Sequence, residues 1–304
     1  MKKILILLGI GLILVLVIAI ISRGPVPVPP PNDQPDELRL ATWNLEWFGA
    51  LGRSPDDIRE IAAIIRELKL DIVALQEITC PCTLENLAEE LDFQWYISPQ
   101  RIPQKLALIW APGKVKNVFF DENAYRSLEK VAFTGLSSES RQPLVFRLQS
   151  GAFDFSLIVV HLKAIPEAER SVEIRNVQYD AINRWLADEL ARPGAEEDIM
   201  IAGDFNAFRS GISSERLLAA GYVEFATDTL GDDEYSNIWY DRDGDRNLSF
   251  IDHIALTPSL RQEEFREILP IRDWDKNYPA DAFERRISDH LPLVAIFDTT
   301  RDLD

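Results

Sequence analysis

Apolar runs of strand length recur along the chain from residue 38 to its end. Most are near-continuous rather than alternating, which is typical of strands buried on both faces. The predicted strands occupy residues 38–45, 71–77, 105–111, 143–149, 153–162, 198–205, 249–257 and 291–298. A region of this length predicts one large α/β or β-sandwich domain, or two small ones.

Helical patterns interleave with these strands. Residues 54–69 begin with Ser54 as the N-cap, Pro55 at the first helical position and acidic residues in the first turn. The apolar positions that follow fall on one face, as in a helix that packs on a sheet. A longer helix is predicted over residues 167–190.

The chain opens with a different pattern. Lys2 and Lys3 precede an unbroken apolar run of eighteen residues, 4–21, which as a helix spans about 27 Å, close to the hydrocarbon core of a bilayer. The run ends in "IAIISRG", without a small-residue cleavage site, which favours an uncleaved transmembrane helix over a secretory signal. The lysine pair predicts a cytoplasmic N-terminus. We therefore expect a membrane-anchored protein whose main domain is extracytoplasmic, with secretion as the alternative.

Three regions follow from these patterns. Residues 1–23 are the anchor or signal segment, residues 24–37 are a proline-rich linker, and residues 38–304 are the folded domain. The linker predicts an extended polyproline spacer of up to about 40 Å, which would hold the domain away from a membrane.

Charge and cysteine content narrow the function only in part. The chain has 32 basic and 50 acidic residues, a net charge of −18. This balance argues against a tight, sequence-independent grip on nucleic acid by many lysines, but permits transient processing of a phosphate substrate through a bound cation.

Cys80 and Cys82 could be unpaired, bridged or metal-related, although two thiols alone cannot complete a zinc site.

Polar side chains gather where the predicted strands begin or end. Asp252 stands inside the apolar run "FIDHIAL", where a carboxylate is costly unless it is paired or bound to a metal. A folded sheet can bring strand ends together, so the sequence predicts one polar cleft. The strand-end residues are Asn44, Glu46, Gln76, Glu77, His161, Lys163, Asp204, Asn206, Asp289 and His290.

Seven short segments between residues 41 and 294 carry these side chains, namely "TWNLE", "LQE", "SRQP", "HLKA", "GDFNA", "SFIDHI" and "SDHLP". In this order they resemble the motifs of the endonuclease/exonuclease/phosphatase superfamily, the fold of DNase I and exonuclease III. The resemblance implies an α/β, four-layer sandwich of two packed β-sheets flanked by helices, with the site at one edge. The expected chain is this DNase I-like domain preceded by one N-terminal transmembrane helix.

The resemblance also implies metal-dependent hydrolysis of a phosphodiester by water. Glu77 is the main metal ligand by this likeness, with Asn44 and Asp289 as further oxygen ligands. Mg²⁺ and Mn²⁺ prefer carboxylate and carbonyl oxygens, so Mg²⁺ or Mn²⁺ is the expected cofactor.

The catalytic side chains are implied by the same likeness. Asp204 and Asn206 orient and activate water or assist the leaving group, and Asn206 also contacts substrate. His290 contacts phosphate and is held in its orientation by a hydrogen bond to Asp252.

Three further positions complete the expected site and its surroundings. His161 matches a phosphate-contacting position. Arg141 in "SRQP" matches another, with a surface salt bridge as the alternative. His253 follows Asp252 and should point the opposite way along the strand, so we expect a structural role for it.

The favoured function is that of a nuclease acting on DNA. A lipid-head-group phosphodiesterase of sphingomyelinase type, or another phosphatase of the superfamily, is the alternative. A lipid-acting enzyme should carry an exposed apolar loop, and no such loop is evident in the sequence. A non-catalytic relative would normally lack a ligand, yet every expected polar position is filled. Nucleic acid is the expected transient partner, the membrane is reached through the N-terminal helix, and no protein partner is indicated.

Overall fold

The computed structural model describes residues 36–50, 52–128, 141–165, 168–209, 212–279 and 281–302. The predicted anchor, and the predicted linker up to residue 35, lie outside these ranges. Within them, no helix combines the length and apolar character needed to cross a membrane.

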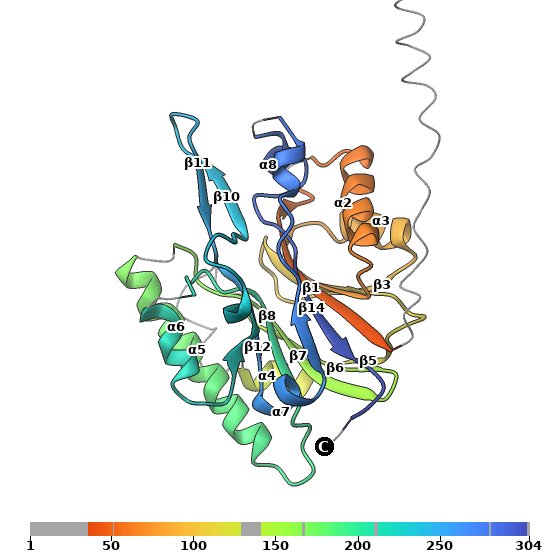
Figure 1. Cartoon of the computed structure of the whole chain (residues 1–304), viewed down its shortest axis with the longest axis vertical. Helices are drawn as coiled ribbons and strands as arrows, with labels where there is room; N and C mark the ends of the chain where they lie inside the picture. Colours follow the sequence, from red (N-terminus) through yellow and green to blue (C-terminus); the bar gives the residue numbers. More distant parts are fainter. Residues whose placement is uncertain are drawn as a thin grey trace, which may run out of the picture. The chain divides into compact units, whose positions relative to one another are not determined.

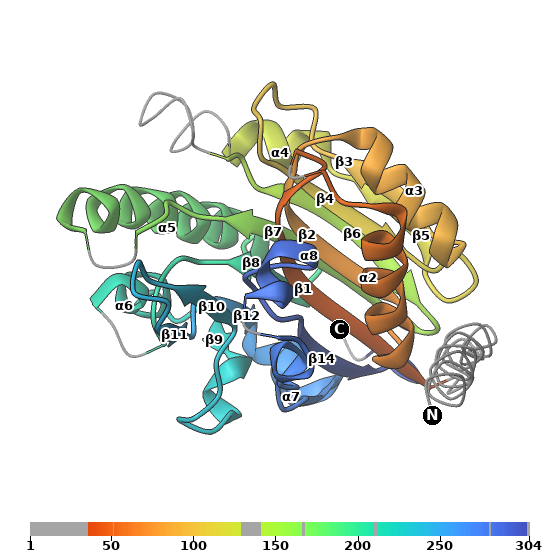
Figure 2. The ribbon, with the colours of Figure 1, turned by 90° about the horizontal axis from the view of Figure 1, so that it is seen from above.

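Two six-stranded mixed β-sheets form the centre of the domain (Figures 1 and 2). The first sheet has the order β13-β14-β1-β2-β4-β3 and the second has the order β5-β6-β7-β8-β12-β9. The first consists of β1 (Glu37–Phe48), β2 (Ile72–Ile78), β3 (Gln94–Ile97), β4 (Lys105–Trp110), β13 (Phe265–Ile268) and β14 (Leu293–Asp298). The second consists of β5 (Lys116–Phe120), β6 (Leu144–Ser150), β7 (Phe153–His161), β8 (Ile199–Asp204), β9 (Glu224–Phe225) and β12 (Asp252–Leu256).

Strand direction decides which residues meet at one edge. The pairs β1–β2 and β7–β8 are parallel, so the carboxyl ends of each pair lie together. β12 runs antiparallel to β8, which brings the start of β12 to the end of β8.

Helices cover the outer faces of both sheets, as Figure 2 shows. α2 (Pro55–Glu67) and α3 (Pro81–Leu91) pack on the first sheet. α4 (Glu122–Leu128), α5 (Glu169–Leu190) and α6 (Ile212–Leu218) pack on the second. The predicted arrangement of two packed sheets flanked by helices is therefore confirmed.

Alternation within β1 explains why its sequence looks continuously apolar. Leu38 and Leu40 face the core between the sheets, whereas Ala41 and Trp43 face α2 and α3. The predicted cap of α2 is also present. Ser54 accepts a hydrogen bond from the Asp57 amide, and the Asp57 carboxylate accepts one from the Ser54 amide.

Smaller elements complete the described chain. β10 (Asn237–Tyr240) and β11 (Arg246–Ser249) form a separate two-stranded hairpin, labelled in Figure 1. The connection between its strands turns at Asp243 and Gly244, with Gly244 at a φ of 84°. The other elements are η2 (Ala226–Thr229), α7 (Pro258–Glu263), η3 (Trp274–Asn277) and α8 (Ala282–Arg286).

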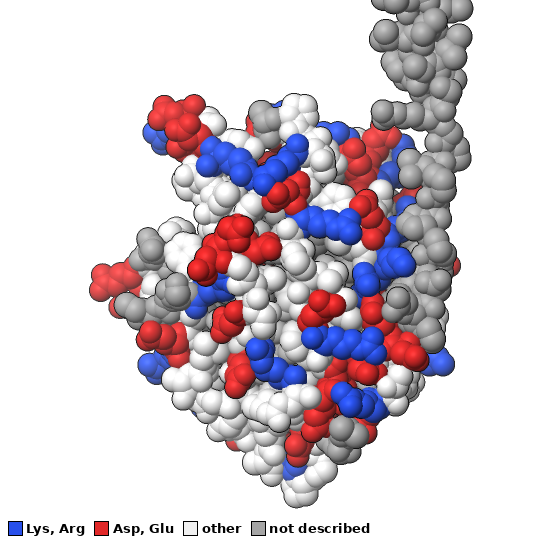
Figure 3. Space-filling model, viewed as in Figure 1, with Lys and Arg blue, Asp and Glu red and all other residues white. Residues whose placement is uncertain are grey.

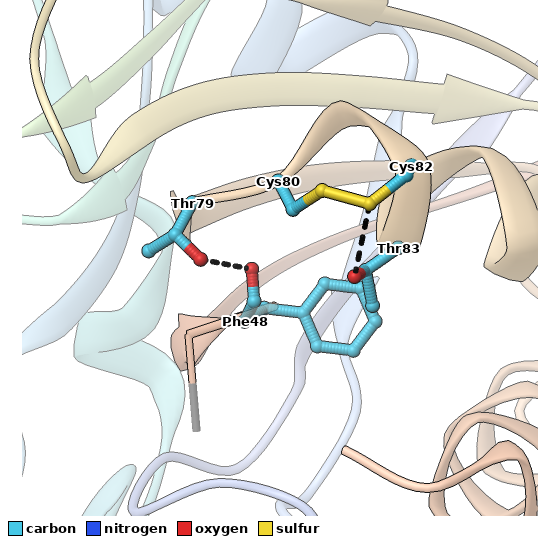
Figure 4. The surroundings of a disulfide bond; sticks show 5 residues. All are labelled: Phe48, Thr79, Cys80, Cys82 and Thr83. Carbon is cyan, nitrogen blue, oxygen red and sulfur yellow. Dashed lines mark hydrogen bonds between the residues drawn. A yellow bond between two sulfur atoms is a disulfide. The ribbon is translucent and has the colours of Figure 1, made fainter. Parts of the chain in front are cut away.

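Cys80 and Cys82 form a disulfide at the start of α3 (Figure 4). This is one of the three states that the sequence leaves open. The bridge follows Thr79, whose hydroxyl donates to the Phe48 carbonyl at 2.8 Å. It also packs on the turn after β1, because a Cβ at Gly49 would lie 2.7 Å from the Cys80 Cβ.

Candidate active site

The predicted polar side chains converge at one edge of the sandwich. Asn44 and Glu77 stand near the ends of β1 and β2 in the first sheet. His161 and Asp252 are each paired with Asp204 across neighbouring strands of the second sheet. One hydrogen-bonding group joins the two sheets here, because Asn44 Nδ2 lies 3.3 Å from Glu77 Oε1 and 3.1 Å from Asp204 Oδ2.

His290 forms the expected pair with Asp252. Its Nδ1 lies 2.7 Å from Asp252 Oδ2, and both side chains are buried. Burial lowers the pKa of His290, but Asp252 and Asp289 outweigh it and hold the pKa well above its ordinary value of 6.5. The imidazole is therefore protonated at neutral pH, which makes the pair a charge-assisted hydrogen bond.

The backbone around His290 is fixed from the first sheet. The Trp43 indole N–H donates to the His290 carbonyl at 2.9 Å. The Ser288 hydroxyl accepts from the His290 amide at 2.9 Å and donates to the Asn44 carbonyl at 2.6 Å. The "SDH" segment is thus tied to the end of β1, where the oxygen ligands are expected.

Asp204 occupies the centre of the cluster. Burial, and then the neighbouring Asp252 carboxylate, raise the pKa of Asp204 to about 7. Its Oδ2 lies 3.4 Å from His161 Nε2 and 3.8 Å from His290 Nε2. Its Oδ1 accepts from the Asn206 amide at 2.8 Å. Such a carboxyl is poised to take or give a proton near neutral pH.

His161 differs from His290 in charge. Burial lowers its pKa well below 6.5, and the positive charges of Arg141 and His290 add to this. A neutral imidazole can donate one hydrogen bond without carrying charge. His161 Nε2 also lies 3.8 Å from Glu77 Oε1, so the side chain faces both sheets.

Glu77 and Asp289 supply the oxygen atoms that a hard cation prefers. Glu77 has a φ of 61° and sits where the pairing of β2 shifts register, a feature that commonly re-aims a side chain beside an active site. Burial raises the pKa of Asp289, and Glu77 adds to the rise although His290 opposes it. Asp289 Oδ1 is buried and has no hydrogen-bond partner among the described residues. A divalent cation would relieve this excess of negative charge, so these residues fit Mg²⁺ or Mn²⁺.

Asn44 enters the site through its amide nitrogen. Its Oδ1 accepts from the Glu46 amide at 3.0 Å, while its Nδ2 faces Glu77 and Asp204. Asn44 therefore lies beside Glu77 and Asp204, and its role as a ligand stays a prediction.

A second grouping also has ligand atoms close together. Atoms of Asp204, Asp252 and His290 lie within 4.8 Å of one another. His290 and Asp252 already bind each other, however, and a protonated imidazole has no free lone pair for a metal. We therefore favour the Glu77 and Asp289 oxygens as the metal position.

Arg141 is buried rather than at the surface. It is 9% exposed, lines the central cavity and donates to Gln104 Oε1. Gln104 in turn donates to Glu77 Oε2. Asn206 is also buried and lines this cavity, with its Nδ2 3.3 Å from the Leu162 carbonyl.

A cavity of about 730 Å³ opens between these groups. Glu77, His161, Asp204, Asp289 and His290 line it together with Asn206 and Arg141. Every side chain to which the sequence assigned a catalytic, substrate-binding or metal-binding role, except Asn44 and Asp252, therefore borders one space, whereas the strand-end residues Glu46, Gln76 and Lys163 do not line it. Asp252 is placed behind His290, as expected for an orienting group.

Gln104 and Asn237 escaped the sequence-based prediction, whereas Glu46 was among its strand-end residues without an assigned role. Gln104 lies in a segment without a motif, and only its contacts reveal it. Glu46 is two residues after Asn44, and burial followed by Asp289 raises its pKa to about 7. The acidic end of "TWNLE" was the available signal. Asn237 lines the cavity, and its Nδ2 lies 3.2 Å from the Asp289 carbonyl.

His253 faces away from the site, as expected. Its Nε2 lies 2.8 Å from the Ala207 carbonyl and its Nδ1 lies 3.1 Å from the Thr227 hydroxyl. The ring stacks on Phe225. Burial lowers its pKa to about 4, so it is a neutral, hydrogen-bonded core residue.

The rim of the cavity is apolar, which the sequence did not indicate. Trp47, Ile165 and Trp239 line the cavity and are 41%, 64% and 48% exposed. Trp239 belongs to the β10–β11 hairpin, which also exposes Leu248 at 45%. No exposed apolar loop is evident in the sequence, and these exposed side chains of the hairpin belong to its strands. Tryptophan and leucine in a turn-rich hairpin do not form a long apolar run, which hides them in the sequence.

Charge on the surface is mixed. On the face shown in Figure 3, acidic and basic side chains are interspersed and no continuous basic stripe is present. This face therefore offers no track for a long polyanion.

The comparisons with known proteins agree with this fold. A family model described as "Endonuclease/Exonuclease/phosphatase family" matches residues 41–290. No curated protein sequence matches the chain. Many solved structures have a similar fold, and three of them, each less than 20% identical in sequence to this chain, are described below.

The catalytic domain of human Nocturnin with bound sulfate has a TM-score of 0.60 at 19% identity, covering 86% of this chain and 94% of that one. The mannosyl-6-phosphatase Bt3783 of Bacteroides thetaiotaomicron has a TM-score of 0.58 at 18% identity, covering 85% and 98%. D. rerio TDP2 complexed with a single-strand DNA product has a TM-score of 0.60 at 16% identity, covering 86% and 98%.

Proposed function

We propose that this chain, which belongs to the endonuclease/exonuclease/phosphatase family, is a divalent-metal-dependent phosphodiester hydrolase that acts on DNA as a nuclease. The observation that carries the proposal is the cavity lined by Asp204, His161 and His290 beside the Glu77 and Asp289 oxygens. A proton-accepting carboxyl, a protonated imidazole and a set of hard oxygen ligands are the parts that hydrolysis of a phosphodiester requires.

Asp204 takes the proton of the attacking water in this proposal. Its pKa of about 7 supports that role, because a carboxyl with this pKa is partly ionised at neutral pH and can therefore accept a proton there. Asn206 orients the water or the leaving group from the same strand end. His290, held protonated by Asp252, stabilises the negative charge that develops on the phosphate.

Glu77 and Asp289 would hold the divalent ion, with Asn44 Nδ2 donating to Glu77 Oε1 at 3.3 Å. When bound, Mg²⁺ or Mn²⁺ polarises a phosphoryl oxygen and neutralises charge on the leaving oxygen. Gln104 and the Trp47 amide donate to Glu77 and fix its carboxylate. His161 and Arg141 bind phosphate oxygens. Arg141 and Gln104 form a chain that links phosphate recognition to the position of Glu77.

An activity screen of the full-length chain tests the proposal. We expect cleavage of plasmid or single-stranded DNA with Mg²⁺ or Mn²⁺, no cleavage in chelator, and none by Glu77→Gln. RNA, abasic DNA, sphingomyelin and a sugar phosphate are the further substrates. Turnover of one of these without cleavage of DNA would refute the nuclease assignment but keep the hydrolase. If the wild type turns over none of these substrates with Mg²⁺ or Mn²⁺, the hydrolase itself is refuted; equal turnover by Glu77→Gln would instead remove Glu77 from the metal position.

A lipid-head-group phosphodiesterase is the second candidate. The exposed side chain of Trp239 at the cavity rim favours it, because an exposed tryptophan inserts into the interface of a membrane; Leu248 is exposed on the opposite face of the same hairpin. Trp239→Ala with Leu248→Ala should then lower turnover of sphingomyelin in vesicles more than turnover of a soluble diester. Equal effects on both substrates would exclude a membrane-facing role for the hairpin.

We also propose that residues 1–23 anchor the domain on the extracytoplasmic side of a membrane, with secretion as the alternative. The Cys80–Cys82 disulfide supports this location, because disulfides persist mainly in oxidising compartments. The acidic net charge of −18 supports a transient rather than a tight contact with nucleic acid.

A further inference from the structure

A second group of acidic side chains lies at the opposite end of β8 from the candidate active site. Asp198, Glu264 and Asp302 each place a carboxylate oxygen within 4.8 Å of the others. Asp198 directly precedes β8, whereas Asp204 ends it. The strand between them spans about 20 Å, so the two groups are separate.

Glu264 is the member of this group that indicates a ligand. Its side chain is 0% exposed, and neither of its carboxylate oxygens receives a hydrogen bond from a donor group among the described residues, since its close side-chain neighbour is the Asp198 carboxyl. Arg301 attracts it electrostatically, but the Arg301 guanidinium donates to the backbone carbonyl of Glu263 instead. Burial, and then the Asp198 carboxylate, raise the pKa of Glu264 to about 8. A buried carboxylate without a donor is strongly unfavourable unless a cation binds it or a proton neutralises it.

The position of the group connects the two sheets. Asp198 leads into β8 of the second sheet, and Asp302 accepts a hydrogen bond from the Asp154 amide of β7 at 3.2 Å. The Glu264 carbonyl accepts from the Asp298 amide of β14, in the first sheet, at 2.7 Å. An ion bound by all three carboxylates would therefore join segments of both sheets.

We propose that Asp198, Glu264 and Asp302 bind a structural Ca²⁺ ion that ties the two sheets together at the end of β8 remote from catalysis. Three carboxylates offer only hard oxygen ligands, which select Ca²⁺ or Mg²⁺ over softer metals. The ligands come from three separate segments, and Ca²⁺ accepts six to eight oxygens in flexible geometry, whereas Mg²⁺ requires a near-ideal octahedron.

Thermal melting of the full-length chain tests the site. After removal of metal by a chelator, Ca²⁺ at about a hundred times its dissociation constant should raise Tm on the order of 5–10 °C. Glu264→Gln keeps the shape of the side chain but removes its charge, and should abolish this shift. Glu263→Gln removes a neighbouring charge outside the group and should keep it. Glu77→Gln alters the other site and should also keep it.

Two results would overturn the proposal. One is a Ca²⁺-induced shift of equal size in the wild type and in Glu264→Gln. The other is that Ca²⁺ does not change the Tm of the wild type, while Glu264→Gln has a higher Tm than the wild type in chelator at pH 8. That result would mean that Glu264 and Asp198 share a proton. If Glu264→Gln fails to fold, Asp302→Asn on the partly exposed member, with calorimetric titration of Ca²⁺, decides the matter. We expect one fewer bound Ca²⁺ than in the wild type, and a count equal to that of the wild type would refute the site.

Discussion

The hydrogen bond between His290 and Asp252 allows a quantitative test of the proposed mechanism. The Nδ1–Oδ2 distance is 2.7 Å and both side chains are buried, so the bond is charge-assisted and contributes about 1.5–3 kcal/mol. Since about 1.4 kcal/mol corresponds to a tenfold change in rate, Asp252→Asn should lower kcat by about 10- to 150-fold. His290→Ala removes the group itself and should lower kcat on the order of 10²–10⁴-fold.

The double variant distinguishes a pair from two independent residues. Asp252 acts by orienting His290 and keeping its imidazole protonated, so its replacement should have little further effect on kcat once the imidazole is absent. The double variant should therefore be little slower than His290→Ala alone. The measurement is kcat at saturating Mg²⁺ for the four proteins, with a thermal melt of each to confirm folding.

A result in which the two losses multiply would refute the pairing as a functional unit. His253→Asn is the matched control, because it lies beside Asp252 but points to Ala207 and Thr227. This variant should lower Tm but leave kcat close to that of the wild type. A large loss of kcat in His253→Asn with an unchanged melt would mean that the wrong histidine has been assigned.

Three further predictions concern the metal, the N-terminus and pH. Glu77→Gln should abolish turnover without changing the melt, because a neutral amide binds a hard divalent ion weakly; turnover near wild type would remove Glu77 from the metal position. Deletion of residues 1–36 should give a soluble domain with a cooperative melt and full activity, and an insoluble product would show that the segment packs on the domain. The pKa of His253 is about 4 when folded and 6.5 in a model peptide, so the unfolded chain binds the proton first as pH falls. The free energy of unfolding of the wild type should fall by up to about 3 kcal/mol as the pH is lowered from 6.5 to 4. In urea titrations, the unfolding free energy of His253→Gln should depend less on pH over this range.

The parts of the fold that sequence predicts are those with a local signature. The cap at Ser54 and the apolar face of α2 depend on residues a few positions apart. The opposite orientations of Asp252 and His253 follow from the period of a strand. The His290–Asp252 bond spans 38 residues, yet family motifs located both partners.

The parts that sequence could not predict depend on contacts between segments without motifs. Gln104 joins Glu77 to Arg141 across loops that carry no recognisable pattern. Trp239 becomes part of the cavity rim only because the β10–β11 hairpin stands beside it. Glu264 becomes exceptional only when its complete burial is known.

The glycine of "GDFNA" has a role in geometry rather than in chemistry. A Cβ at Gly203 would lie 2.0 Å from the Val160 carbonyl oxygen, a contact that requires β7 and β8 to move apart. Val160 precedes His161 and Gly203 precedes Asp204, so the same close approach brings His161 Nε2 within 3.4 Å of Asp204 Oδ2. Any side chain at position 203 would separate these two groups before it touched either of them. The motif therefore places its glycine where the backbone distance between two strands sets the distance between a proposed phosphate ligand and a proposed base.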